Sequence, residues 1–114
     1  MSITLWKIGY GIIENRPSID VCIIGAVGID TNIYLFAKEI DFIVEVNFSE
    51  NIDYIGGAGG YSCRNIAQFG DRTAVIGYID NDYYGKYIRM ELGRDKIDIS
   101  GLMVDPKGTK RSVN

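Results

Sequence analysis

The chain is organised around the segment Tyr54-Ile-Gly-Gly-Ala-Gly-Gly-Tyr-Ser-Cys-Arg-Asn-Ile-Ala-Gln-Phe-Gly70. Four glycines lie within Gly56–Gly60, where they accept positive φ and let a ligand approach the main chain. Small and apolar residues then recur at helical spacing: Cys63, Ile66, Ala67 and Gly70. The segment predicts a strand, a glycine-rich loop and a short helix that Gly70 terminates, with free helix N–H groups directed at the loop. An ordinary tight turn of an α/β protein explains the glycines equally well.

The composition limits the classes of function. The chain has 114 residues, enough for one domain, and its 46% hydrophobic and 24% charged residues are typical of a globular protein. A net charge of −3 argues against a nucleic-acid partner. The absence of histidine excludes Ser-His and Cys-His nucleophiles and removes the commonest transition-metal ligand. The two cysteines lie in apolar runs without metal-ligand spacing, which favours free thiols in a reducing compartment.

No segment predicts export or a membrane span. The N-terminal residues lack a basic region followed by a continuous apolar core. No apolar run approaches the roughly 20 residues that a spanning helix needs. We therefore expect a cytoplasmic protein without a membrane partner.

Two short apolar runs, Val21–Val27 and Thr73–Ile79, have the pattern of strands buried on both faces, as in a parallel sheet. The first runs into Gly28-Ile-Asp30 and would place the Asp30 carboxylate at the carboxyl end of a central strand. Ligands bind at that end of open α/β sheets. A solvated carboxylate at the end of a strand is the plain alternative for Asp30.

Between these runs the pattern changes to alternation with period two. Thr31–Ala37 and Phe42–Phe48 both alternate, and a short connection separates them. They predict a small antiparallel β flap at about residues 31–48. Residues 1–20 have a mixed period and are read as an N-terminal extension to the domain at residues 21–114.

The rest of the chain returns to strand–helix alternation. Asp82 is expected to cap a helix whose apolar stripe ends at Gly93, and Ile97–Val104 is expected to form one more strand. A turn at Asp105–Gly108 leads into the final residues. This order predicts a parallel sheet with crossover helices.

In its order of motifs, the sequence resembles the N-terminal third of the ribokinase-like (PfkB-type) carbohydrate kinases. The matching segments are Val21–Asp30, Gly56-Gly-Ala-Gly59 with Phe69-Gly70, Asp82 with Gly85, and Gly108–Asn114. The sequence departs from the family pattern at four positions, Ala58, Tyr61, Cys63 and Asp80. Tyr61 stands where the family usually has asparagine, so the departures bear on the identity of the substrate more than on the fold.

The resemblance implies a three-layer core with a parallel sheet and a β flap as lid, incomplete in this chain. It implies transfer of the γ-phosphoryl group of ATP to a hydroxyl of a sugar, nucleoside or sugar phosphate. The substrate-binding residues it implies here are Asp30, Gly56, Gly57, Gly59 and Tyr61. ATP and Mg²⁺ are implied as cofactors, with sites mostly outside this chain. The family base lies in a Gly-Ala-Gly-Asp motif that this sequence lacks, so no catalytic or metal-binding residue is assigned and the chain alone is expected to be inactive.

Two other classes of function stay open. One is a small nucleotide- or ligand-binding module without catalysis, in which Gly25–Gly28 and Gly56–Gly60 cradle a phosphate. The other is an interaction protein that pairs through the free edges of its flap strands, and such pairing would also give a kinase a homodimer interface.

Overall fold

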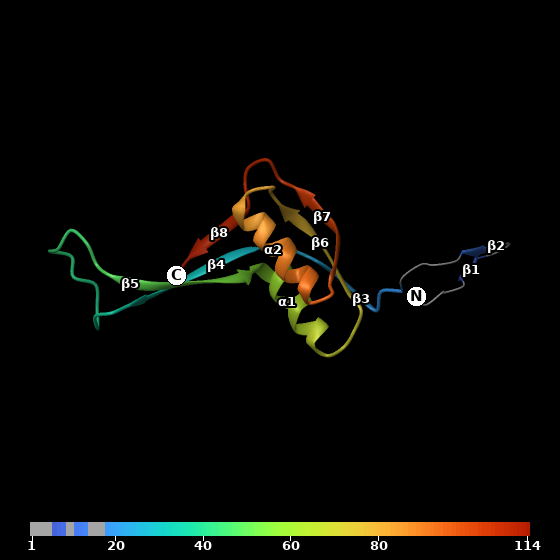
Figure 1. Ribbon diagram of the computed structural model, residues 1–114, viewed down its shortest axis with the longest axis horizontal. Helices are drawn as coiled ribbons and strands as arrows, with labels where there is room; N and C mark the ends of the chain where they lie inside the picture. The colour runs from blue at the N-terminus through green and yellow to red at the C-terminus, as the bar shows by residue number, and fades with distance from the viewer. Residues whose placement is uncertain (1–5, 9–10, 14–17) are drawn as a thin grey trace.

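The computed structural model describes residues 6–8, 11–13 and 18–114 of the chain (Figure 1). Strands β1 (Trp6–Ile8) and β2 (Gly11–Ile13) form an antiparallel pair in which Trp6 lies opposite Ile13. The remaining residues of the predicted N-terminal extension, up to residue 17, lie outside the described ranges.

A parallel sheet forms the centre of the molecule. Its strands are β3 (Val21–Ile24), β6 (Thr73–Ile79) and β7 (Asp98–Val104), in the order β3-β6-β7. Helix α1 (Gly57–Gln68) precedes β6, and helix α2 (Tyr83–Arg94) connects β6 to β7. The predicted α/β class and parallel sheet are therefore confirmed.

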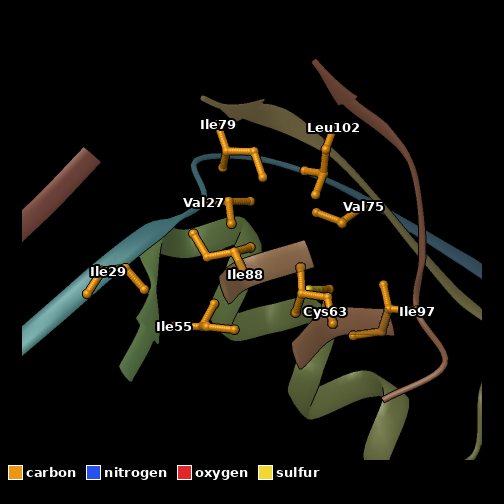
Figure 2. Close-up of a cluster of buried hydrophobic side chains, with 10 residues drawn as sticks. Val27, Ile29, Ile55, Cys63, Val75, Ile79, Ile88, Ile97 and Leu102 are labelled. Carbon is orange, nitrogen blue, oxygen red and sulfur yellow. The ribbon is translucent and has the colours of Figure 1, made fainter. Parts of the chain in front are cut away.

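Both helices pack on the same face of this sheet. Val75 and Ile79 of β6 are fully buried against Ile88 of α2 and Cys63 of α1, as Figure 2 shows. Burial also raises the pKa of the Cys63 thiol. Val75 and Ile79 lie on the same face of β6, and together with the apolar stripe of α2 they contribute to the buried core.

In the described part of the chain, no element covers the other face of the same sheet. Burial alternates along β3 and along most of β6, and Ile24 and Tyr78 are 78% and 57% exposed. The prediction that the Val21–Val27 and Thr73–Ile79 segments are buried on both faces is wrong for this chain. A continuous apolar run does not reveal whether the chain itself supplies a cover for each face.

A second sheet, the flap sheet, consists of β5 (Ser49–Gly56), β4 (Gly28–Leu35) and β8 (Lys110–Val113), in the order β5-β4-β8. Strand β4 is antiparallel to β5 and parallel to β8. Figure 1 shows β4 and β5 projecting away from the helices. The flap is thus present, but the strand predicted at Phe42–Phe48 is wrong, because these residues belong to the connection between β4 and β5.

Three glycine predictions have different outcomes. Gly70 has φ of +88° just beyond α1, as a helix-terminating glycine should. Gly93 lies within α2, and Lys96 adopts positive φ after that helix instead. Residues Gly57–Gly60 form the first turn of α1 and not a separate loop.

In the described part of the chain, no helix is long and apolar enough to cross a membrane.

Candidate functional site

A pocket of about 470 Å³ lies between the flap sheet and α1. Strand β4 contributes Asp30 and Asn32 to its wall, and β5 contributes Tyr54 and Ile55. Helix α1 contributes Tyr61, Arg64, Asn65 and Gln68. The wall thus combines one carboxylate, three side-chain amides, one guanidinium and two tyrosines.

Asp30 is the third residue of β4, with Tyr54 opposite it on β5 and Ser112 opposite it on β8. The hydroxyl of Ser112 donates a hydrogen bond of 2.5 Å to Oδ1 of Asp30. Among the described residues, no donor bonds the other oxygen, Oδ2. The prediction that Asp30 ends the buried strand is wrong in detail, since β3 ends at Ile24 and Asp30 lies inside the next strand. The half-buried carboxylate still retains one free oxygen.

Gly56 makes room for this carboxylate. A Cβ at Gly56 would overlap the Asp30 carboxyl group, and the atom it would meet first is Oδ2. The carboxylate therefore spans from Ser112 on β8 to the backbone of β5 at Gly56. The absence of a Cβ at Gly56 thus allows a side chain of the protein itself to approach the main chain closely.

Gly57 and Gly59 serve the packing of α1 on the connection between β3 and β4. Gly57 has φ of +78°, and a Cβ there would overlap the carbonyl group of Ala26. A Cβ at Gly59 would come within 2.7 Å of the carbonyl of Gly25. The backbone N–H of Gly59 donates to the Ala26 carbonyl at 2.8 Å. These glycines allow backbone to meet backbone at the start of the helix.

The predicted residues therefore meet in two neighbouring places. Asp30 and Tyr61 line the larger pocket, whereas Gly56, Gly57 and Gly59 are absent from its wall. Gly57 lines a smaller pocket of about 190 Å³, which Asp30 and Ser112 also reach.

Sequence reasoning missed the polar partners on α1. Arg64, Asn65 and Gln68 follow Tyr61 at i+3, i+4 and i+7, so they share its side of the helix. Asn32 follows Asp30 at i+2 and therefore lies on the same face of β4. This spacing is visible in the sequence, but an exposed polar stripe on a helix does not by itself indicate a binding site. For Ser112 no comparable local signal exists, because 82 positions separate it from Asp30.

Arg64 joins the wall of the pocket to α2. Its Nε donates to Oδ2 of Asp95 at 2.7 Å, and Nη2 lies 3.9 Å from Oε2 of Glu91. These contacts hold the exposed side of α1 against the C-terminal end of α2 and fix one edge of the pocket.

Asp82 has a structural role. Its Oδ1 accepts the N–H of Gly85 at 2.8 Å, so it caps α2 as expected. The hydroxyl and N–H of Thr109 donate to its two oxygens at 2.6 and 2.8 Å. The hydrogen bond from the Thr109 hydroxyl is the main cause that lowers the pKa of Asp82.

No protein-family model matches the chain. A curated relative, the 5-dehydro-2-deoxygluconokinase of Photobacterium profundum, is 27% identical over 100 residues. The match covers 88% of this chain and 28% of the relative.

Solved structures with a similar fold include several sugar kinases. An uncharacterized sugar kinase from Pyrococcus horikoshii is 26% identical with a TM-score of 0.64, over 82% of this chain and 30% of that one. A microbiome-derived acarbose kinase has a TM-score of 0.73 at 23% identity, over 86% of this chain and 33% of that one. The ribokinase of Cryptococcus neoformans var. grubii serotype A, in complex with ADP, has a TM-score of 0.66 at 23% identity, over 84% of this chain and 30% of that one. The chain therefore resembles ribokinase-like sugar kinases in sequence and fold, and it spans about a third of their length or less.

Proposed function

We propose that the chain is the N-terminal, sugar-binding part of an ATP-dependent sugar kinase. The observation that carries this proposal is the Asp30 carboxylate, which lines a polar pocket and has one oxygen without a protein donor among the described residues. The likeness to sugar kinases gives this pocket its expected substrate class, a sugar, nucleoside or sugar phosphate.

The residues around the pocket suit a polyhydroxylated ligand. A carboxylate accepts hydrogen bonds from hydroxyls, and such charge-assisted bonds are roughly twice as strong as neutral ones. The side-chain amides of Asn32, Asn65 and Gln68 can each donate and accept, which matches the dual character of a hydroxyl. Tyr61, which also lines the pocket, is 65% exposed, and its aromatic ring is available for contact with a ligand.

The curated relative is named for the phosphorylation of a sugar acid. Among the described residues, Arg64 is the cationic side chain of the larger pocket wall, and Lys110 and Arg111 line the smaller pocket that also reaches Asp30. A sugar acid therefore belongs among the ligands to be tested, beside neutral sugars.

ATP enters the proposal through the neighbours, which include a P. horikoshii sugar kinase in complex with ATP, and Mg²⁺ enters it through the resemblance to the carbohydrate kinases. We assign a site for neither in the described part of the chain. The sequence has no Gly-Lys-Ser/Thr motif, and its described residues hold no group of three His, Cys, Asp or Glu side chains placed to bind a metal. No catalytic step is assigned to this chain, and we expect it to show no kinase activity alone.

Binding of D-ribose, D-fructose and D-gluconate to residues 1–114 tests the proposal. The affinities are measured by NMR titration at millimolar ligand, for the wild type, Asp30→Asn and the control Asp71→Asn. Asp71 is exposed and absent from the wall of either pocket. Loss of a hydrogen bond to a charged group should weaken binding by about ten- to a hundredfold in Asp30→Asn. Equal affinities in the wild type and Asp30→Asn, or no binding of any of the three ligands to the wild type, would contradict the proposal.

A further inference from the structure

Ser112 and Asp30 are neighbours only through the parallel pairing of β8 with β4. This pairing places Gly28–Thr31 beside Lys110–Val113, with Asp30 and Ser112 in direct register. Residues in register on adjacent strands point to the same face, so the Ser112 hydroxyl meets the Asp30 carboxylate at 2.5 Å.

We propose that Ser112 is a positioning residue for the substrate-binding carboxylate. This inference rests on the proposed function of Asp30. The Ser112 hydroxyl holds Oδ1 on the β8 side, and Oδ2 consequently lies on the β5 side, above Gly56. Tyr54, two residues before Gly56, lines the larger pocket on that side. The hydrogen bond thus leaves Oδ2 on the β5 side of the carboxylate, the side on which Tyr54 lines the larger pocket.

Strand β8 is a firm support for this hydrogen bond. The backbone N–H of Asn114 donates to the Thr31 carbonyl, and the N–H of Ile33 donates to the Asn114 carbonyl, both at 2.8 Å. Arg111 Nε donates to Thr31 Oγ1 at 2.8 Å, and its guanidinium carbon lies 5.1 Å from the centre of the Tyr84 ring. Anchors on both sides of Ser112 therefore fix its backbone relative to Asp30.

A carboxylate that is already oriented loses less conformational freedom when a ligand binds. Without the Ser112 hydroxyl, the Asp30 side chain can rotate, and part of the binding free energy is used to restrict it. Ser112 should therefore change the affinity for the sugar without contacting it. Its effect should vanish when Asp30 can no longer bind the ligand.

The test compares Ser112→Val with Ser112→Thr. These variants have nearly the same shape, but only threonine keeps the hydroxyl. We expect Ser112→Val to weaken binding of the tightest of the three probes, D-ribose, D-fructose or D-gluconate, by about three- to tenfold. Ser112→Thr should stay within about twofold of the wild type. The control is Ser100→Val, since Ser100 donates to Asp98 at 2.7 Å in β7, away from both pockets.

The double variant Asp30→Asn/Ser112→Val separates positioning from a general structural effect. If Ser112 acts through Asp30, the double variant should bind no more weakly than Asp30→Asn alone. Additive losses, or equal affinities for Ser112→Val and Ser112→Thr, would overturn the inference. If Asp30→Asn itself binds as the wild type does, the proposed function fails first. If Asp30→Asn weakens binding and Ser112→Val does not, only the positioning role of Ser112 fails.

Discussion

Asp30 and Asp82 both follow an apolar strand-like run in the sequence, yet their carboxylates have different surroundings. Both oxygens of Asp82 accept hydrogen bonds from the protein, from Gly85 and Thr109. Asp30 has one protein donor, Ser112, among the described residues. A fully bonded carboxylate at the start of a helix stabilises the fold, whereas a partly bonded one in a pocket is available to a ligand.

Replacing Asp82 by alanine should therefore lower stability. We expect the free energy of unfolding at pH 7 to fall by about 1–2 kcal/mol, because the cap of α2 is lost. Urea unfolding of Asp82→Ala and of the exposed control Asp71→Ala measures this difference. A loss of stability no greater than that of the control would show that the hydrogen bonds from Thr109 and Gly85 to this carboxylate do not stabilise the fold.

Acid should weaken the fold through the same residue. The Thr109 hydrogen bonds lower the pKa of Asp82 below its usual 3.8 in the folded state. The ionised carboxylate therefore favours the folded state, fully so above pH 3.8, and this contribution is lost as the pH falls through the folded-state pKa. Thr109→Val removes the main cause of the shift. The free energy of unfolding, measured with urea at pH 7, 5, 4 and 3, should fall less steeply toward acid pH in Thr109→Val than in the wild type. An unchanged slope would contradict this explanation.

Elements with a local signal were predictable from the sequence, and those that depend on distant pairing were not. The helical spacing after Gly60 predicted α1, and the apolar run at Thr73–Ile79 predicted β6. The alternation at Phe42–Phe48 was misleading, because β4 pairs with the more polar β5 from Gly28 opposite Gly56 to Leu35 opposite Ser49. Asp30 and Tyr61 could be singled out by motif, but their partner residues on α1 and β8 depend on tertiary packing.

The glycines of the two helices should respond oppositely to substitution. Gly59→Ala would push a Cβ into the Gly25 carbonyl, so we expect a clear loss of stability. Gly93 lies in α2 with open space where its Cβ would be, so Gly93→Ala should stabilise the protein by about 0.5–1 kcal/mol. Thermal and urea unfolding of the two variants provides the comparison. Similar effects of both substitutions on stability would show that the close approach of Gly59 to Gly25 does not exclude a side chain at the start of α1.

The molecule as a whole has one covered and one open face on its parallel sheet. Cys22, Ile24, Tyr78 and Met103 are exposed on β3, β6 and β7, while α1 and α2 bury the opposite face. In the proposed complete kinase, we expect further elements to cover the open face. The chain alone should tend to self-associate, because exposed apolar faces and strand edges favour pairing.

A lysine on either face of β3 distinguishes the two environments. Ile24→Lys should reduce self-association with little loss of stability, because Ile24 is 78% exposed. Its neighbour Ile23 packs against the core, so Ile23→Lys should destabilise the fold strongly. Size-exclusion chromatography and thermal unfolding report the two effects. A wild type that is monomeric at high concentration would contradict the expected role of the open face.

Residue-resolved NMR mapping of sugar and nucleotide binding to residues 1–114 tests the central claim most directly. The amides to be followed are those around the larger pocket, on β4, β5 and α1, and those at Gly57–Gly60. Because the N–H groups of Gly59 and Gly60 already donate to Ala26, they are poorly placed to cradle a phosphate. If the chain is the sugar-binding part of a kinase, sugar should shift the amide resonances around Asp30, Tyr61 and Asn65. ATP should leave the amide resonances of Gly57–Gly60 unchanged. Shifts at Gly57–Gly60 with ATP, and none around Asp30 with any sugar, would contradict the claim and favour a nucleotide-binding module.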